Sequence, residues 1–370
     1  MRILINCSNL KVGGGLQVAH SFLNEIGNNA EHDFHVILSE TLNEQIDQSV
    51  FLPNFSFQVY SIRPTVIKAL LGNDSKLNKI EESFNPDRVF SVFGPTYWKP
   101  KAKHVCGFAK PDYIYKESPF FKILSFKENI KLKVLEFLQM YSFQNHTDVI
   151  ITENEDVSIR LRKKIIQPIY TVTNYFNQVF LDNTKWDNSI EIPKTDSFKF
   201  LTISANYPHK NLEILKKVVP ILLDKYPNFK FNFYLTVTEE DFGFLPTKSK
   251  ECITFLGKVS INQCPNLYSQ CDFLFLPTLL ECFSASYCEA MVMKKPILTS
   301  NLSFAKGICK DSAVYFDPMN PENIADVIYD LAMNKEKQME LINKGIEQLK
   351  AFDNSSQRAE KYLQIITSQK

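Results

Sequence analysis

The sequence has no closely spaced cysteine pair. Its eight cysteines include no Cys-x-x-Cys and are scattered through segments with strand or helix patterns. Buried free thiols in a reducing compartment fit this distribution better than a disulfide framework does. The six histidines do not cluster with the cysteines at ligand spacing, so we expect no metal site.

Long apolar runs are also missing. No segment reaches the roughly 18 apolar residues of a transmembrane helix, and the apolar run within residues 1–8 is shorter than that of a secretion signal. Positive and negative charges nearly cancel, leaving a net charge of +1, which excludes a general polyanion binder but not a local basic patch. We expect a cytosolic protein that can contact a membrane only at its surface.

What the sequence does contain is a regular alternation of short apolar runs and helix-period segments. Runs that are apolar throughout are typical of strands buried on both faces of a parallel sheet, with helices as crossovers. The expected strands are residues 2–8, 34–40, 57–63, 88–93, 103–109, 148–152, 169–174, 198–204, 229–237, 252–259, 272–277, 296–300 and 313–317.

A polar stretch without a clear period predicts a linker at residues 183–197. On either side we expect a Rossmann-like α/β domain, at residues 1–182 and 198–352, followed by a helix at 353–370 that can pack back on the first domain. Two such domains create a cleft at the carboxyl ends of their strands, where ligands usually bind.

The most informative segment runs from Asp272 to Met291. A strand is followed by a loop with Glu281, and Ser284 or Ser286 can cap a helix that carries Glu289. A helix N-terminus offers free N–H groups and partial positive charge to an anion or to sugar hydroxyls. Two carboxylates at this spacing can face one pocket. The spacing alone equally allows a capped surface helix with incidental glutamates.

This segment resembles the E-x7-E element of glycosyltransferase family 4, the retaining enzymes with the GT-B fold. Surrounding motifs that resemble the same family, in the same order, are Phe255-Leu-Gly257-Lys-Val-Ser, Asn266-Leu-Tyr268-Ser-Gln-Cys-Asp272, Pro296-Ile-Leu-Thr-Ser300-Asn301 and Tyr315-Phe-Asp-Pro318. The resemblance covers residues 198–333 well and the first half of the chain more loosely. It implies a GT-B fold and transfer of a sugar from a nucleoside diphosphate sugar.

The resemblance also implies roles for this element. Glu289 would bind the ribose hydroxyls of the donor, while Glu281 and the loop with Phe283 and Ser284 would hold the donor sugar. The family usually has glycines on both sides of the phenylalanine. This chain has Cys282 and Ser284 there, which restricts close approach of the backbone.

A second element, Ser204-Ala-Asn206-Tyr-Pro-His209-Lys210-Asn211, follows a strand and precedes a helix. A lysine at this place can stabilise the charge that develops on a leaving diphosphate. Lys210 matches the phosphate-binding lysine of the family, and Asn206 and His209 are candidate donor contacts. Many members have an arginine where this chain has Ala205, and His209 is a candidate partial replacement. A solvated lysine at a helix start is the alternative reading.

Three further candidate sites carry weaker sequence signals. Residues 12–15 are Val-Gly-Gly-Gly and resemble the N-terminal glycine loop of the family, in which Gly14 and Gly15 would face the diphosphate. Gly257 lies in the turn expected near the nucleotide base. His104, at a strand, roughly matches a family position near the reacting sugar and is a catalytic candidate, although a histidine in a strand is more often structural.

The region 99–138 is basic and apolar at once. From Lys99 to Lys133 there are nine lysines (99, 101, 103, 110, 116, 122, 127, 131 and 133) against three acidic residues (Asp112, Glu117 and Glu128). Eleven apolar residues lie in the same region: Phe120, Phe121, Ile123, Leu124, Phe126, Ile130, Leu132, Val134, Leu135, Phe137 and Leu138. Such a helix can rest on an anionic membrane or can pack against the core with a solvated lysine face. No nucleic-acid motif accompanies the patch.

Taken together, the residues and the resemblance predict a retaining glycosyltransferase of the hexosyltransferase type. It would move a sugar to a hydroxyl of a glycan or lipid-linked acceptor in surface polysaccharide assembly, with no cofactor and no obligatory metal. No carboxylate nucleophile stands out in the first half, which favours a front-face mechanism. The alternatives are an inactive nucleotide-sugar binder and a nucleotide-sugar epimerase on the same fold.

Overall fold

The computed structural model describes residues 1–11, 13–243 and 245–368, which form two compact units. The first unit comprises residues 1–114, 124–174 and 353–370, and the second comprises 115–123 and 175–352. Compared with the expected domain ranges, residues 115–123 and 175–182 therefore lie in the second unit. The peptide chain passes between the units four times.

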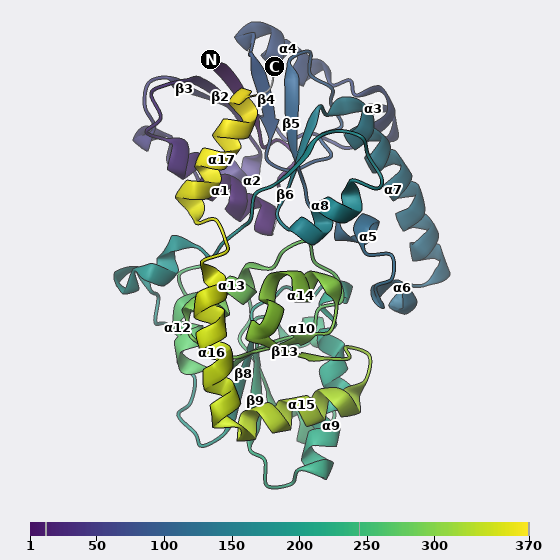
Figure 1. Ribbon diagram of the computed structural model, residues 1–370, viewed down its shortest axis with the longest axis vertical. Helices are drawn as coiled ribbons and strands as arrows, with labels where there is room; N and C mark the ends of the chain where they lie inside the picture. The colour runs from purple at the N-terminus through teal and green to yellow at the C-terminus, as the bar shows by residue number, and fades with distance from the viewer. Residues whose placement is uncertain (12, 244, 369–370) are drawn as a thin grey trace. The chain divides into compact units, whose positions relative to one another are not determined.

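The first unit is a parallel sheet of seven strands in the order β3-β2-β1-β4-β5-β6-β7 (Figure 1). Its strands are β1 (Arg2–Asn6), β2 (Asp33–Leu38), β3 (Phe55–Val59), β4 (Arg88–Ser91), β5 (Lys103–Phe108), β6 (Val149–Thr152) and β7 (Ile169–Thr171). Its helices are α1 (Gly14–Ile26), α2 (Glu40–Asn43), α3 (Val66–Leu71), α4 (Ser75–Phe84), α5 (Pro111–Ile114), α7 (Phe126–His146), α8 (Glu155–Leu161) and α17 (Ser355–Ser368).

Alternation along β1 divides the core of this unit into two layers. Ile3 and Ile5 point into the cluster beneath α1 and α17, whereas Leu4 points to the opposite face, where α4 packs. In α17, Tyr362 stands edge-on to Phe22 of α1 and lies against Phe90 of β4, with ring centroids 5.5 and 5.3 Å apart. Helix α17 therefore completes the core of a unit whose other elements precede it by about 180 residues or more.

The second unit is a parallel sheet of six strands in the order β10-β9-β8-β11-β12-β13. Its strands are β8 (Phe198–Thr202), β9 (Phe231–Leu235), β10 (Ile253–Phe255), β11 (Phe273–Leu276), β12 (Ile297–Ser300) and β13 (Ala313–Phe316). Its helices are α6 (Phe120–Ile123), α9 (Leu215–Lys225), α10 (Glu239–Phe242), α11 (Thr247–Lys250), α12 (Cys264–Gln270), α13 (Ala285–Val292), α14 (Ser303–Cys309), α15 (Pro321–Met333) and α16 (Lys335–Leu349). All thirteen expected strands are present, and the expected α/β fold is confirmed.

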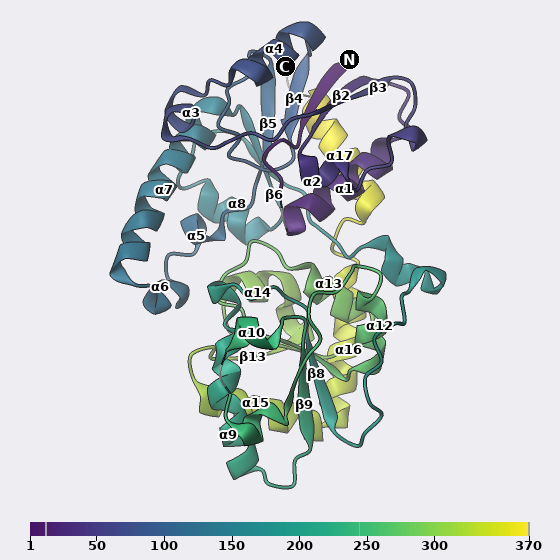
Figure 2. The same ribbon diagram turned by 180° about the vertical axis from the view of Figure 1, so that it is seen from behind.

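The apolar residues between Phe120 and Leu138 are not part of the buried core, contrary to the alternative in which this helix packs them there. None of the eleven apolar residues from Phe120 to Leu138 is buried, and six of them are exposed. Helix α7 lies at the side of the first unit in both views (Figures 1 and 2). Only its second half contributes fully buried side chains, such as Gln139 and Phe143. In the described part of the chain, no helix is long and apolar enough to cross a membrane.

We predict that Tyr362→Ala lowers the free energy of unfolding of the first unit by about 3–5 kcal/mol, because it removes a fully buried aromatic ring that contacts Phe22 and Phe90. Denaturant unfolding, followed by a probe in the first unit, measures this change. Gln364→Ala, an exposed change on the same helix, is the control. An equal small effect of both variants would contradict a core role for α17.

Candidate active site

The second unit has a topological switch point between β8 and β11. Strands β9 and β10 extend the sheet from one side of β8, whereas β11, β12 and β13 extend it from the other. In such sheets the loops after the two central strands diverge and leave a crevice at their carboxyl ends. The hydroxyl of Thr202, the last residue of β8, donates to the carbonyl of Phe275 in β11 at 2.5 Å, which fixes the two strand ends together.

An ion pair between Lys210 and Glu281 joins the loops after these two strands. Both side chains are largely buried, with 17% and 11% of their surfaces exposed. The loop of Glu281 is held to that of Lys210 by the amide of Leu279, which donates to the carbonyl of His209 at 2.7 Å. The Thr278 hydroxyl lies 3.2 Å from the same carbonyl and 3.1 Å from Oε1 of Glu281. The structure thus brings two predicted site residues into direct contact.

The loop from Glu281 leads straight into α13. Ser284 is the N-cap residue, and its side chain makes no cap hydrogen bond. The backbone of Ser284 is extended, at φ −121° and ψ 117°, a conformation open to any residue. A glycine is therefore not needed at this position. Phe283 packs edge-on against Phe352 at 5.8 Å, which orients the loop.

Glu289 lies in the buried face of α13, with 7% of its surface exposed. Burial raises the pKa of its carboxyl to about 7, and a hydrogen bond from the Tyr268 hydroxyl at 3.1 Å partly opposes that rise. Tyr268 comes from α12 and carries no role in the sequence-based expectations. A buried carboxylate with one donor is an acceptor with lone pairs to spare, which suits ligand hydroxyl groups.

His209 is the candidate partial replacement for the arginine that this chain lacks at Ala205. Burial lowers the pKa of His209, against an opposing effect of Glu281, and so disfavours the charged ring. It stacks on Tyr207 with ring centroids 5.6 Å apart. Asn206 donates from its side chain to the carbonyl of Asp241 at the end of α10, which ties the loop after β8 to that helix. Lys210 is therefore the positive charge of this loop.

Residues 115–123 pack against this site, a contact that the sequence did not reveal. The Ser118 hydroxyl donates to the carbonyl of Leu279 at 2.6 Å, and Ser118 is buried. Phe120 stands edge-on to His209 with ring centroids 6.1 Å apart, and Tyr115 packs edge-on against Phe304 at 5.8 Å. The loop with Glu281 is thus supported by a segment 161 residues earlier in the chain.

The predicted glycines lie in two places. Gly257, after β10, has a left-handed backbone with φ +72°, and a Cβ there would meet no atom within 4 Å. In the first unit, Gly14 and Gly15 begin α1 behind Gly13, which has φ +77° and provides no side-chain cap. The N-terminus of α1 is therefore open to an anion. Val12, also part of the expected glycine loop, lies outside the described residues.

The catalytic hypothesis for His104 is not supported. This residue lies in β5 with 1% of its surface exposed, and burial lowers its pKa to about 4. Its Nδ1 donates to the carbonyl of His146 at 2.6 Å, and its Nε2 lies 2.8 Å from the Ser91 hydroxyl. Both ring nitrogens are occupied inside the unit, so His104 is a core histidine, as strand histidines usually are.

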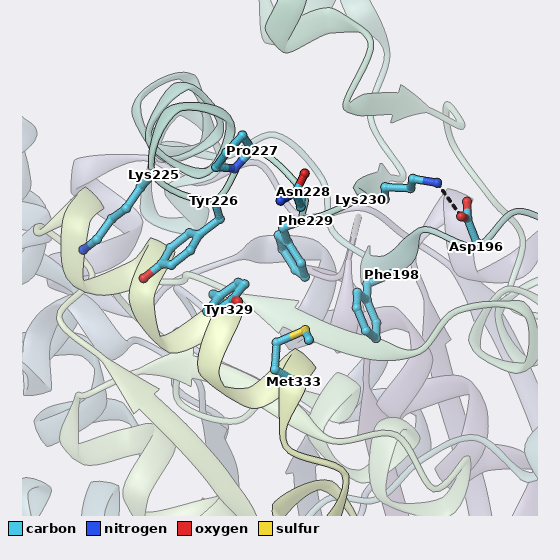
Figure 3. Close-up of a pocket in the computed structure, with 10 residues that line it drawn as sticks. All are labelled: Asp196, Phe198, Lys225, Tyr226, Pro227, Asn228, Phe229, Lys230, Tyr329 and Met333. Carbon is cyan, nitrogen blue, oxygen red and sulfur yellow. Dashed lines mark hydrogen bonds and ion pairs between the residues drawn. The ribbon is translucent and has the colours of Figure 1, made fainter.

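A pocket of about 440 Å³ lies at the other end of the second sheet (Figure 3). It surrounds Phe198 at the start of β8 and the stacked rings of Tyr226 and Tyr329. Its charged groups are already paired, as the ion pair between Lys230 and Asp196 at 2.5 Å shows. Ligands of parallel sheets bind at the carboxyl ends of the strands, so this pocket is not the candidate site.

The second unit matches a known family model in sequence. The family model described as "Glycosyl transferases group 1" matches residues 182–348. The matched region contains Lys210, Glu281 and Glu289. The O-antigen chain mannosyltransferase RfbU of Salmonella typhimurium is 25% identical over 162 residues, which are 42% of this chain and 44% of that protein. The match thus spans less than half the length of this relative.

Solved glycosyltransferases share the fold of the whole chain. WaaG, a glycosyltransferase involved in lipopolysaccharide biosynthesis, superimposes with a TM-score of 0.71, 13% identity and complete coverage of both chains. HepE of Anabaena, in complex with UDP-glucose, gives 0.68, 13% and complete coverage. A glycosyltransferase of Rickettsia africae gives 0.65 and 15%, over 99% of this chain and 97% of that one. The chain therefore has the two-domain GT-B fold.

We predict that the carboxyl group of Glu289 titrates with a midpoint of about 7, measured by NMR on its side-chain carbonyl carbon. Tyr268→Phe should move this midpoint upward, because it removes a donor that favours the charged carboxylate. Tyr287→Phe is the matched control, since the Tyr287 hydroxyl contacts Thr299. A pKa midpoint near 4.5 in the wild type would show that the carboxyl group of Glu289 is solvated and not buried.

Proposed function

We propose that this protein is a glycosyltransferase that moves a sugar, with retention of configuration, from a nucleoside diphosphate sugar to a hydroxyl of a glycan or lipid-linked acceptor. The observation that carries the proposal is the Lys210–Glu281 pair at the switch point of the sheet, in the region that matches the glycosyl transferases group 1 model. The cation Lys210 and the hydrogen-bond acceptor Glu281 lie in contact at the position proposed for the diphosphate and the sugar of the donor.

Glu289 is the proposed contact for the ribose of the donor. Its carboxylate is buried, held by one tyrosine hydroxyl, and placed on α13. Ribose offers neighbouring hydroxyls that can both donate to the oxygens of one carboxylate. A buried carboxylate without such donors is costly, so a ligand that supplies them gains affinity at this position.

Lys210 is the proposed partner of the diphosphate. One of its three N–H donors is directed to Glu281, which leaves the others for phosphate oxygens. As the bond between the anomeric carbon and the phosphate oxygen breaks, negative charge grows on the leaving group. A fixed ammonium in a largely buried site stabilises that charge, and the N-terminus of α13 adds partial positive charge nearby in the chain.

Glu281 is the proposed acceptor for hydroxyls of the transferred sugar. Lys210 and Thr278 hold its Oε1, which fixes the carboxylate before the donor arrives. We further propose that the leaving phosphate oxygen takes the proton of the attacking hydroxyl, which requires no protein nucleophile. No cofactor or metal enters this scheme. The setting proposed is surface polysaccharide assembly, supported by the similarity to RfbU, an O-antigen chain mannosyltransferase, and to WaaG, which is involved in lipopolysaccharide biosynthesis.

Donor cleavage separates this proposal from an inactive binder. A panel of nucleotide sugars is first screened by thermal stabilisation, because a ligand at 100 times its Kd adds about 2.7 kcal/mol. The donor that binds is then incubated without acceptor, and release of the nucleoside diphosphate is followed. Slow hydrolysis supports a transferase, whereas tight binding without any cleavage, with or without glycan acceptors, supports a binding protein.

We predict that Lys210→Ala lowers kcat by about 10²–10³ with little change in KM, because the lysine contributes most when charge has moved onto the diphosphate. Lys217→Ala, an exposed lysine of α9 in the same unit, is the control and should keep wild-type rates. Initial rates across donor concentrations measure both constants. Normal turnover with only a raised KM would place Lys210 in ground-state binding alone.

We predict that Glu289→Ala weakens binding of the selected nucleoside diphosphate by about 1.5–3 kcal/mol, measured by calorimetry. In the wild type, affinity should fall about tenfold from pH 8 to pH 6, because protonation near pH 7 removes the carboxylate that accepts the ribose hydroxyls. Glu289→Gln should abolish this pH dependence. An unchanged affinity for Glu289→Ala would exclude the ribose contact.

A further inference from the structure

Helix α7 presents an apolar stripe to solvent. Phe126, Ile130, Val134, Phe137 and Tyr141 are exposed by 80, 47, 56, 67 and 37%. They recur at intervals of four, four, three and four residues, which places them within an arc of about 80° on one face of a helix. Fully buried side chains of the helix lie on another face, near its C-terminal end. The stripe is therefore additional to the face that packs on the sheet.

Charges are arranged around this stripe by sign. At 3.6 residues per turn, Lys133 and Lys127 lie about 20° outside the two edges of the stripe, and Lys131 lies about 60° outside it. Of the acidic residues of the helix, Glu136 lies about 80° outside the stripe and Glu128 on the opposite side. An apolar face with lysines along both edges is the pattern of a helix that lies in the interface of an anionic bilayer.

Helix α3 extends the apolar surface. It packs against α7, and the two helices lie side by side in both ribbon views. Four of its six residues are exposed and apolar: Val66, Ile67, Leu70 and Leu71. Ile67 and Leu71 are each more than two thirds exposed. Two neighbouring helices with large exposed aliphatic and aromatic side chains exceed the scattered apolar residues of an ordinary surface.

The surroundings of α3 add positive charge. Lys68 of α3 lines a cavity of about 800 Å³ in the first unit, with Lys11, Arg63 and Lys76 as further cations and Glu40 and Asp74 as the acidic lining residues. Asp74 is already engaged by Lys68 at 2.5 Å and by the Tyr60 hydroxyl at 2.8 Å. The remaining charge beside the apolar helix is therefore mainly positive, which suits phosphate headgroups.

We propose that the exposed faces of α3 and α7 dock the first unit on an anionic lipid bilayer, with the apolar side chains among the acyl chains and the lysines at the phosphates. A second copy of this chain fits the surface less well. A two-fold interface would bring the lysines that line one stripe toward those of the other, and like charges would repel. The bilayer alone satisfies both the apolar face and the cations.

Vesicle co-sedimentation of the whole chain tests the proposal. Vesicles of phosphatidylglycerol and phosphatidylcholine are compared with pure phosphatidylcholine, at 50 mM and 500 mM salt. We expect binding to the anionic vesicles at low salt that weakens at high salt, as screening requires. The triple variant Lys127→Gln, Lys131→Gln and Lys133→Gln should bind about 100-fold more weakly, at roughly 1 kcal/mol per lysine.

Control variants distinguish a specific effect of the α3 and α7 surface from a general effect of removing lysines or apolar side chains. Lys217→Gln, Lys248→Gln and Lys335→Gln remove the same charge from exposed sites in the second unit and should bind as the wild type does. A second set, Ile67→Ser, Leu71→Ser, Phe126→Ser and Phe137→Ser, should abolish binding. Its apolar control is Val50→Ser, Leu181→Ser and Met339→Ser, at residues that are also exposed. All these positions are exposed, so each variant is expected to fold.

Three results would overturn the proposal: no vesicle binding by the wild type, equal binding by the α3–α7 variants and their controls, or conversion of a dimer to a monomer by the serine set without any vesicle binding. Light scattering after gel filtration reports the last of these. Binding is measured without donor or acceptor. The result is thus independent of whether the proposed transferase activity is correct.

Discussion

The buried ion pair between Lys210 and Glu281 is the interaction on which the candidate site depends. It joins the loops after β8 and β11, which leave the sheet in diverging directions. Two charges this far from water are tolerated only when each is the partner of the other and further hydrogen bonds hold them. Thr278 and the contacts of the His209 carbonyl supply that support. The pair thereby sets the positions of both loops before any ligand is present.

The loop before α13 also forms without the glycines that the family resemblance implies. Ser284 adopts an extended backbone that places no demand on glycine, and the loop before it is held from outside by Ser118 and Phe120. The side-chain cation of this site is Lys210, whereas burial lowers the pKa of His209. A site with one side-chain cation depends more on helix-end dipoles than one with two.

The sequence predicted the fold better than the site. Buried parallel strands are apolar along their whole length, so all thirteen could be found. Their ends were predicted less well: β3 and β10 each end four residues before the expected ranges 57–63 and 252–259 do, and the side chains of β3 are mostly exposed. The Lys210 and Glu281 loops were predicted because motifs carry them. Ser118 carries no such signal, since its partner is 161 residues away. His104 was a candidate because it roughly matches a position of the resembled family, and only the structure shows its partners Ser91 and His146 in the core.

The place of α17 has a consequence for how the chain folds as it is synthesised. The Ser355 hydroxyl donates to Glu25, and Arg358 donates to the Ser21 hydroxyl, across separations of 330 and 337 residues. The sheet of the first unit therefore stays without part of its cover until the whole second unit has left the ribosome. The second unit needs only residues 115–123 and 175–352, so it can complete its core earlier. Nascent chains that stop before α17 would expose the apolar surface beneath it, around Phe22 and Phe90, and this unit is the one that chaperones would have to protect.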